Sequence, residues 1–192
     1  MQIPTLIQQT DLDGGVVAFV SCGYDFSMLV TVDGVLWSCG SNQFNEIGLG
    51  EDISRSNIFR RVGGDKYFRT GGVRMVSCGL SNSVILAQNN LVWCCGSNED
   101  GELAQPLPLR GPPCLVDRGH FYNVNSELLS DNDIQVVSAG RWLSVAITSD
   151  GLVYTWGKTQ GPSTAPDGQP HRLAEGTLGF AGDTTDHARA CR

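Results

Sequence analysis

The chain repeats itself: residues 17–48 read VAFVSCGYDFSMLVTVDGVLWSCGSNQFNEIG, and residues 73–104 read VRMVSCGLSNSVILAQNNLVWCCGSNEDGELA. Twelve of the 32 paired positions are identical, where chance would give roughly two. Residues 134–157, IQVVSAGRWLSVAITSDGLVYTWG, match the first 24 of these positions at eight. Self-similarity of this kind predicts similar structural units that stack on one another.

Each unit alternates short apolar runs with Gly, Asp and Asn, which predicts short antiparallel strands. The continuous apolar cores Met28–Val30 and Val84–Leu86 predict strands that are covered on both faces. The expected strands are Val16–Ser21, Ser27–Val32 and Val35–Cys39, then Met75–Ser77, Ser83–Gln88 and Leu91–Cys95, then Ile134–Ser138, Ser144–Ser149 and Leu152–Trp156.

The pairs Asp33-Gly34, Asn89-Asn90 and Asp150-Gly151 predict two-residue type I′ hairpins, because both turn residues tolerate positive φ. Four short strands per repeat, covered on both faces, predict an all-β fold, a partial β-propeller of three four-stranded antiparallel blades. A fourth strand is expected to precede each unit, at Thr5–Ile7, Ile58–Arg60 and Cys114–Val116.

These repeats resemble those of the regulator of chromosome condensation repeat family, whose blade runs roughly V-x-x-G-x-x-x-S-x-A-L-T-x-D-G-x-V-Y-x-W-G-x-N-x-x-G-Q-L-G. Two departures stand out. The His before the conserved Ser is Phe26, Asn82 or Leu143, and the third repeat ends in Lys158-Thr159-Gln160-Gly161 rather than Asn-x-x-Gly. The ring of this family normally has seven blades, so the resemblance implies three blades of a larger ring. The residues that carry it are Val20, Gly23, Ser27, Thr31, Asp33, Gly34, Trp37, Gly40, Asn42, Asn45, Ile47, Gly48 and Gly50; Gly79, Ser83, Trp93, Gly96, Asn98, Gly101 and Leu103; and Gly140, Ser144, Thr148, Asp150, Gly151, Tyr154, Trp156 and Gly157.

The resemblance places the repeats in residues 1–161, at approximately 4–50, 56–104 and 113–161. Residues 162–192 are a Gly/Pro-rich tail or the start of a truncated fourth repeat, since Pro170–Leu173 resembles the repeat opening at Pro4–Ile7. Three blades leave two open faces of apolar surface. We therefore expect self-association, or that the chain is part of a longer propeller.

Composition excludes several classes of function. The net charge of −7 argues against direct contact with nucleic acid, because neutralising phosphates needs a basic surface. No apolar run exceeds five residues, and the first residues lack the basic start of a secretory signal, so neither a membrane span nor a signal is expected. Seven cysteines and no Asn-x-Ser/Thr acceptor favour an intracellular location, cytoplasmic or nuclear.

The side chains predict no catalytic constellation, no metal site and no cofactor. The three histidines lack ligand spacing, and no G-x-S-x-G elbow occurs. Cys22 and Cys78 share one repeat position, and Cys39 and Cys95 share another, so we expect the cysteines to pack in the core.

Charge is distributed unevenly along the chain. Residues 1–50 carry five acids and no Lys or Arg, whereas residues 51–76 carry six bases against three acids. A basic segment could contact an acidic protein, a phosphate or a small GTPase. The alternative for the basic segment is a solvated edge strand whose charges prevent edge-to-edge pairing. Trp142, which falls outside the register of the other repeated aromatic residues, could be an exposed anchor for a partner or could fill space between blades. The candidate partner-binding residues are Arg55, Arg60, Arg61, Lys66, Arg69 and Trp142.

The sequence thus predicts a non-enzymatic β-propeller repeat module that mediates protein–protein interaction, since loops on a rigid blade scaffold carry function. The resemblance implies an alternative, because the founding family member is an exchange factor. On that reading the chain is a guanine-nucleotide exchange factor, or a fragment of one, for a Ran-like small GTPase.

Overall fold

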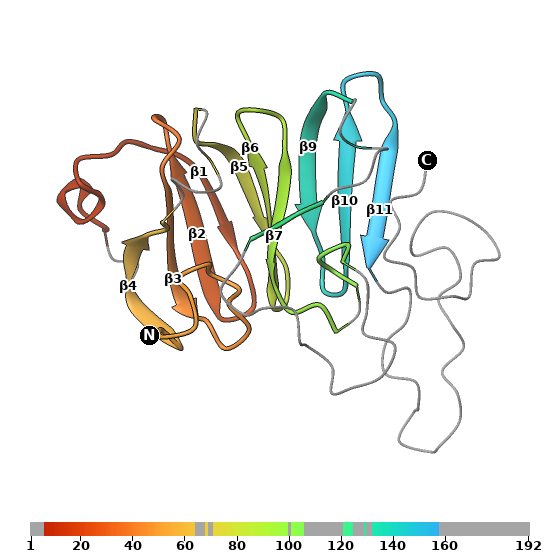
Figure 1. The fold of residues 1–192 in the computed structure, drawn as a ribbon. Coiled ribbons are helices and arrows are strands. Elements are labelled where there is room, and N and C mark those ends of the chain that lie inside the picture. The colour runs from red at the N-terminus through yellow and green to blue at the C-terminus, as the bar shows by residue number, and fades with distance from the viewer. Residues whose placement is uncertain are drawn as a thin grey trace, which may run out of the picture.

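A computed structural model describes residues 6–63, 68, 71–99, 101–105, 121–124, 129 and 132–157. Within them the strands form three antiparallel sheets that stand side by side (Figure 1). A 3-10 turn, η1 (Gln9–Leu12), precedes the first sheet. The first sheet has the order β1 (Val17–Cys22), β2 (Phe26–Thr31), β3 (Leu36–Ser41), β4 (Arg55–Arg61); the second β5 (Val73–Cys78), β6 (Asn82–Ala87), β7 (Val92–Gly96), β8 (Tyr122–Asn123); and the third β9 (Ile134–Ala139), β10 (Leu143–Thr148), β11 (Val153–Gly157).

The three strands expected in each repeat are confirmed, with ends that differ by no more than two residues from the expected ones. The fourth strand is a correction. Ile58–Arg60 lies in β4, which pairs with β3, so this strand closes the first sheet instead of opening the second. Leu6 and Ile7 form no strand, and Cys114–Val116 lie outside the described residues. We call the three sheets blades 1, 2 and 3.

The type I′ hairpins are a second correction. Only the second residue of each pair, Gly34, Asn90 or Gly151, has positive φ. The amide of Thr31 donates to the carbonyl of Val35 at 3.0 Å, so three residues form the first loop, and the equivalent bonds recur in blades 2 and 3. A three-residue loop is one residue longer than a type I′ turn. It needs positive φ only at its last residue, whereas a type I′ turn needs positive φ at both of its central residues.

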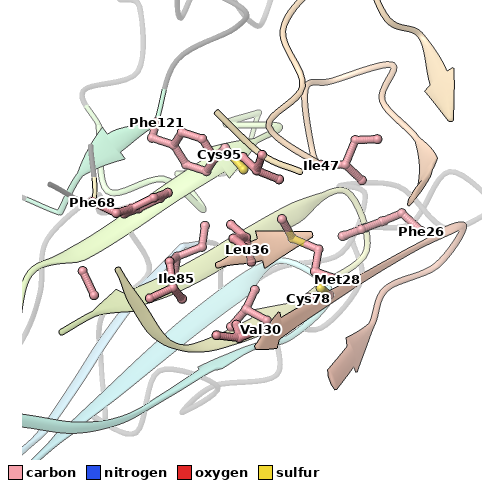
Figure 2. Close-up of a cluster of buried hydrophobic side chains, with 14 residues drawn as sticks. Phe26, Met28, Val30, Leu36, Ile47, Phe68, Cys78, Ile85, Cys95 and Phe121 are labelled. Carbon is pink, nitrogen blue, oxygen red and sulfur yellow. The ribbon is translucent and has the colours of Figure 1, made fainter. Parts of the chain in front are cut away.

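Two apolar cores fill the spaces between the blades. Figure 2 shows the one between blades 1 and 2, where Met28 and Val30 of β2 face Ile85 of β6. Val84 and Leu86, which alternate with Ile85 along β6, instead pack against blade 3. Each face of blade 2 is therefore one half of a core, which explains why β6 is apolar at successive positions.

The outer faces of the three-blade stack keep exposed apolar side chains. On blade 1, Val20 is 61% exposed, and on blade 3, Val153 is 50% exposed and Ile147 is 37% exposed. The expected repeat boundaries and the tail, residues 162–192 with Pro170–Leu173, stay predictions, because the tail lies outside the described residues. In the part of the chain that is described, no helix is both long and apolar enough to pass through a bilayer.

Candidate partner-binding site

Successive blades are joined by hydrogen bonds that repeat from one junction to the next. At the first junction, the Ser83 hydroxyl donates to the Glu46 carbonyl at 2.7 Å, and the Cys95 thiol donates to the same oxygen at 3.5 Å. At the second, the Trp156 indole N–H donates to the Glu102 carbonyl at 2.9 Å, and the Ser144 hydroxyl lies 3.5 Å from it. A loop carbonyl of one repeat thus accepts bonds from the sheet of the next.

The inner strands are joined in a similar way. The Ser21 hydroxyl accepts the amide of Cys78 at 3.0 Å, and the Ser77 hydroxyl accepts the amide of Ala139 at 2.9 Å. Ser21 and Ser77 occupy the same repeat position. Each junction is therefore held by a hydrogen bond at the inner strands and by further hydrogen bonds at the loop.

In the first two repeats an asparagine shapes the loop that presents the accepting carbonyl. Asn42 accepts the amide of Ile47 at 3.1 Å and donates to the carbonyl of Gly50 at 2.8 Å. Asn98 accepts the amide of Leu103 at 3.0 Å in the next repeat. These side-chain bonds replace a regular backbone ladder and hold the loop in one conformation.

Blade 1 carries the same donors, and the structure describes no repeat in front of them. Ser27 and Cys39 occupy the positions of Ser83 and Cys95, yet Ser27 bonds only to the Cys22 sulfur, at 3.5 Å, among the described residues. The indole N–H of Trp37 is buried and has no hydrogen-bond partner in the part of the chain that the structure describes. A pocket of about 390 Å³ opens on this face beside Cys39 and Phe59.

The cysteines divide according to whether a neighbouring blade covers them. Burial raises the pKa of Cys39, raises the pKa of Cys78 to about 11, and raises the pKa of Cys94 further. Cys94 and Cys95 face opposite cores, as adjacent strand residues must. The expectation of core packing is wrong for Cys22, which is exposed because no other described blade covers this face of blade 1.

Three of the basic residues of segment 51–76, Arg55, Arg60 and Arg61, lie on β4, the outer strand of blade 1, whereas Arg74 lies on β5 of blade 2. Arg55 forms an ion pair with Asp25 at 2.7 Å, between Nη1 and Oδ2, with both side chains about half exposed. The hydrogen bond from Arg55 holds the pKa of Asp25 below its ordinary value. The charge of Arg55 is therefore partly neutralised within the chain.

Arg60 and Arg61, the next two candidates on β4, line a pocket of about 550 Å³. Both are exposed, and neither makes an ion pair within the described residues. Arg60 donates from Nε to the Ser56 hydroxyl at 3.2 Å, which fixes the direction of its guanidinium. The remaining lining residues are Gly48, Leu49, Gly50, Ile53, Gly63 and Phe121.

Trp142 lies on blade 3, in the turn that leads into β10. The structure therefore does not bring it together with the arginines of β4, which belong to blade 1. It is half-buried, and the guanidinium carbon of Arg141 lies 4.1 Å from its ring centroid. Lys66 and Arg69 fall outside the described residues.

Sequence reasoning missed the contribution of Phe121 to this pocket, and it missed the bonding role of the repeated serines. Ser27, Ser83 and Ser144 were visible as a recurring position, and that recurrence is the signal for a shared contact. Phe121 lies outside the matched repeats, so no comparable signal marks it.

We expect Ser83→Ala to lower the free energy of unfolding by roughly 1–3 kcal/mol, because it removes the shorter of two bonds to a buried carbonyl. The matched variant Ser27→Ala, at the same repeat position on the open face, should change it by less than roughly 0.5 kcal/mol. Urea unfolding of both variants measures the difference. Equal losses would contradict the role assigned to the junction bond.

Comparison with known proteins agrees with this architecture. The family model of the regulator of chromosome condensation (RCC1) repeat matches residues 17–46 and 73–102. The human X-linked retinitis pigmentosa GTPase regulator is 29% identical over 140 residues, 72% of this chain and 12% of that protein. The mouse secretion-regulating guanine nucleotide exchange factor is 32% identical over 146 residues, 74% of this chain and 28% of that protein. The chain thus spans less than a third of either relative.

Two solved structures share the fold. Yeast RCC1 (Prp20), in its complex with Kap60, gives a TM-score of 0.59 at 24% identity, over 73% of this chain and 32% of that chain. Human WBSCR16 gives a TM-score of 0.63 at 19% identity, over 87% of this chain and 40% of that chain. These structures agree with the fold, a partial β-propeller. The family-model matches and the relatives of similar sequence show that the chain belongs to the regulator of chromosome condensation repeat family.

Proposed function

We propose that the chain is a non-enzymatic β-propeller module that mediates protein–protein interaction, and that the open face of blade 1 is one of its contact surfaces. The observation that supports this is the pair Ser27 and Cys39. Their counterparts in blade 2 bond to the loop carbonyl of the preceding repeat, and in blade 1 that carbonyl is lacking among the described residues. A repeat from a second copy, or from the rest of a longer propeller, would supply it.

The apolar part of the same face supports the proposal. Val20 pairs with Leu29 across β1 and β2, so the two side chains lie on one face with the buried Trp37. Exposed apolar groups beside a buried indole N–H that has no partner among the described residues are typical of a surface that is covered in an assembly.

The absolute mass of the purified 192-residue chain, measured by light scattering beside its thermal unfolding, tests this proposal. We expect a discrete oligomer with sharp melting, which Val20→Glu converts to smaller species because it buries a carboxylate in the contact. The matched control Val32→Glu, in the exposed β2–β3 loop, should leave the mass unchanged. A monomer that unfolds cooperatively and is indifferent to Val20→Glu would overturn the open face as a contact surface.

Guanine-nucleotide exchange on a Ran-like small GTPase is the second candidate, favoured by the similarity to a secretion-regulating guanine nucleotide exchange factor. Release of a fluorescent guanine nucleotide from the GTPase, with and without the chain, measures it directly. No acceleration, and no complex with the nucleotide-free GTPase, would exclude exchange by this chain.

We further propose that this interaction takes place inside the cell, in the cytoplasm or nucleus. The odd number of cysteines and the lack of an Asn-x-Ser/Thr acceptor support a reducing compartment.

A further inference from the structure

The pocket beside Arg60 and Arg61 lies where the outer edge of blade 1 meets the start of the last strand of blade 2. One wall is β4, and the opposite wall is Phe121, the residue before β8. Phe121 is buried, and its ring packs edge-on against Phe68 with centroids 5.2 Å apart (Figure 2). The aromatic wall is therefore part of the core between the blades and is held rigidly.

The loop between the two walls is shaped to leave this space open. Gly48 has φ of +67°, and a Cβ placed on it would lie 2.3 Å from the Phe121 ring. Gly50 has φ of +84°, and Asn45 accepts its amide at 3.0 Å. The loop thus comes close to the ring without side chains that would fill the pocket.

The electrostatic character of the pocket is opposite to that of the chain. The net charge is −7, yet two arginines line the pocket. The loop acids Glu51 and Asp52 are exposed and make no ion pair with either arginine within the described residues. Arg55, on the same strand, already has Asp25 as a partner. Among the described residues, therefore, no carboxylate is paired with Arg60 or Arg61.

The geometry also limits the kind of anion. A guanidinium presents paired N–H donors that match a carboxylate, while Leu49, Ile53 and Phe121 offer an apolar wall to a neighbouring side chain. A volume of about 550 Å³ is far larger than a single ion needs and falls in the usual range of organic ligands. An extended polyanion would meet the negative charge of the rest of the chain.

We propose that this pocket binds a short acidic peptide segment of a partner protein. One carboxylate lies on Arg60 and a second on Arg61, whose side chains leave opposite faces of the edge strand β4, and an adjacent aliphatic side chain lies against Phe121. This inference deepens the proposed interaction function, since it assigns a second contact surface and the chemistry of its partner. It is argued from other residues than Val20, Ser27 and Cys39, which support the open face of blade 1 as a contact surface.

Fluorescence anisotropy with the labelled peptide Glu-Leu-Glu-Asp-Leu-Glu and the full 192-residue chain tests the proposal. We expect saturable binding that weakens with salt, and little binding of the isosteric peptide Gln-Leu-Gln-Asn-Leu-Gln. The double variant Arg60→Gln/Arg61→Gln should lose tenfold or more in affinity, an approximate figure for charge-assisted bonds. The affinity of the variant Arg60→Lys/Arg61→Lys should lie between those of the parent chain and the Gln variant. Lysine keeps the positive charge but lacks the two parallel N–H donors of a guanidinium.

The matched control is Arg55→Gln/Arg141→Gln, which removes the same charge at exposed sites outside the pocket. It should bind within about twofold of the parent chain, and thermal unfolding checks that all variants remain folded. Equal losses in both double variants would mean a general charge effect and would overturn the pocket. Absence of binding, or binding of a phosphoserine peptide but not of the carboxylate peptide, would overturn the proposed ligand. If the mass measurement still shows association, only the pocket fails and the interaction function stands.

Discussion

Gly72→Ala should destabilise the chain by roughly 2–5 kcal/mol, as the sum of left-handed backbone strain and overpacking. Gly72 has φ of +81°, and a Cβ on it would lie 2.5 Å from the carbonyl oxygen of Gly34. That carbonyl is not free to move, because it accepts the amide of Val73 at 2.8 Å and so ties the β2–β3 loop of blade 1 to β5. The added methyl group would force blades 1 and 2 apart at this point.

Gly151→Ala separates the two contributions. Gly151 has φ of +84°, close to that of Gly72, but a Cβ there meets nothing within 4 Å. It should therefore show the backbone strain alone, roughly 1–2 kcal/mol. Urea unfolding of the two variants gives the difference as the cost of the close approach. If Gly151→Ala is as damaging as Gly72→Ala, the contact between Gly72 and Gly34 does not limit stability.

The repeat predicted the blades well because each strand is specified by its own residues. An apolar run such as Val84–Leu86 and the Gly that follows the first strand of each repeat are local signals, and they recur three times. The partner of β4 is not a local property. Nothing in Arg55–Arg61 says whether it bonds to β3 or to β5, so the outer strand was assigned to the wrong blade.

The site was only partly predictable for a related reason. The basic character of β4 could be read from the sequence, and so could the alternative that its charges protect a sheet edge. The pocket also needs Phe121, which is separated from Gly48 by the whole second repeat and meets it only after the blades stack. In the same way, the repeat aligns Cys22 with the buried Cys78, although no described blade covers the face of blade 1 on which Cys22 lies.

Trp156→Ala should remove blade 3 from the folded structure while leaving blades 1 and 2 intact. Trp156 is fully buried in the core between blades 2 and 3, and its indole N–H bonds to the Glu102 carbonyl at 2.9 Å. Replacing a buried Trp by Ala costs roughly 3–5 kcal/mol, and in stacked repeats this cost falls on the interface between neighbours. Blade 3 packs on one neighbour only in the described structure, so it has no second interface to retain it.

Amide hydrogen exchange resolved by blade is the measurement that tests this expectation. Protection should fall in residues 134–157 and persist in β2 and β6, because β6 still shares a core with blade 1. The control Val153→Ala changes a half-exposed residue on the opposite face of the same strand and should leave all three blades protected. Uniform loss across the chain in Trp156→Ala would instead mean that the three blades unfold as one cooperative unit. In that case no blade could unfold without the others. The exposed apolar side chains on the two outer faces would then lower the free energy of unfolding of all three blades together.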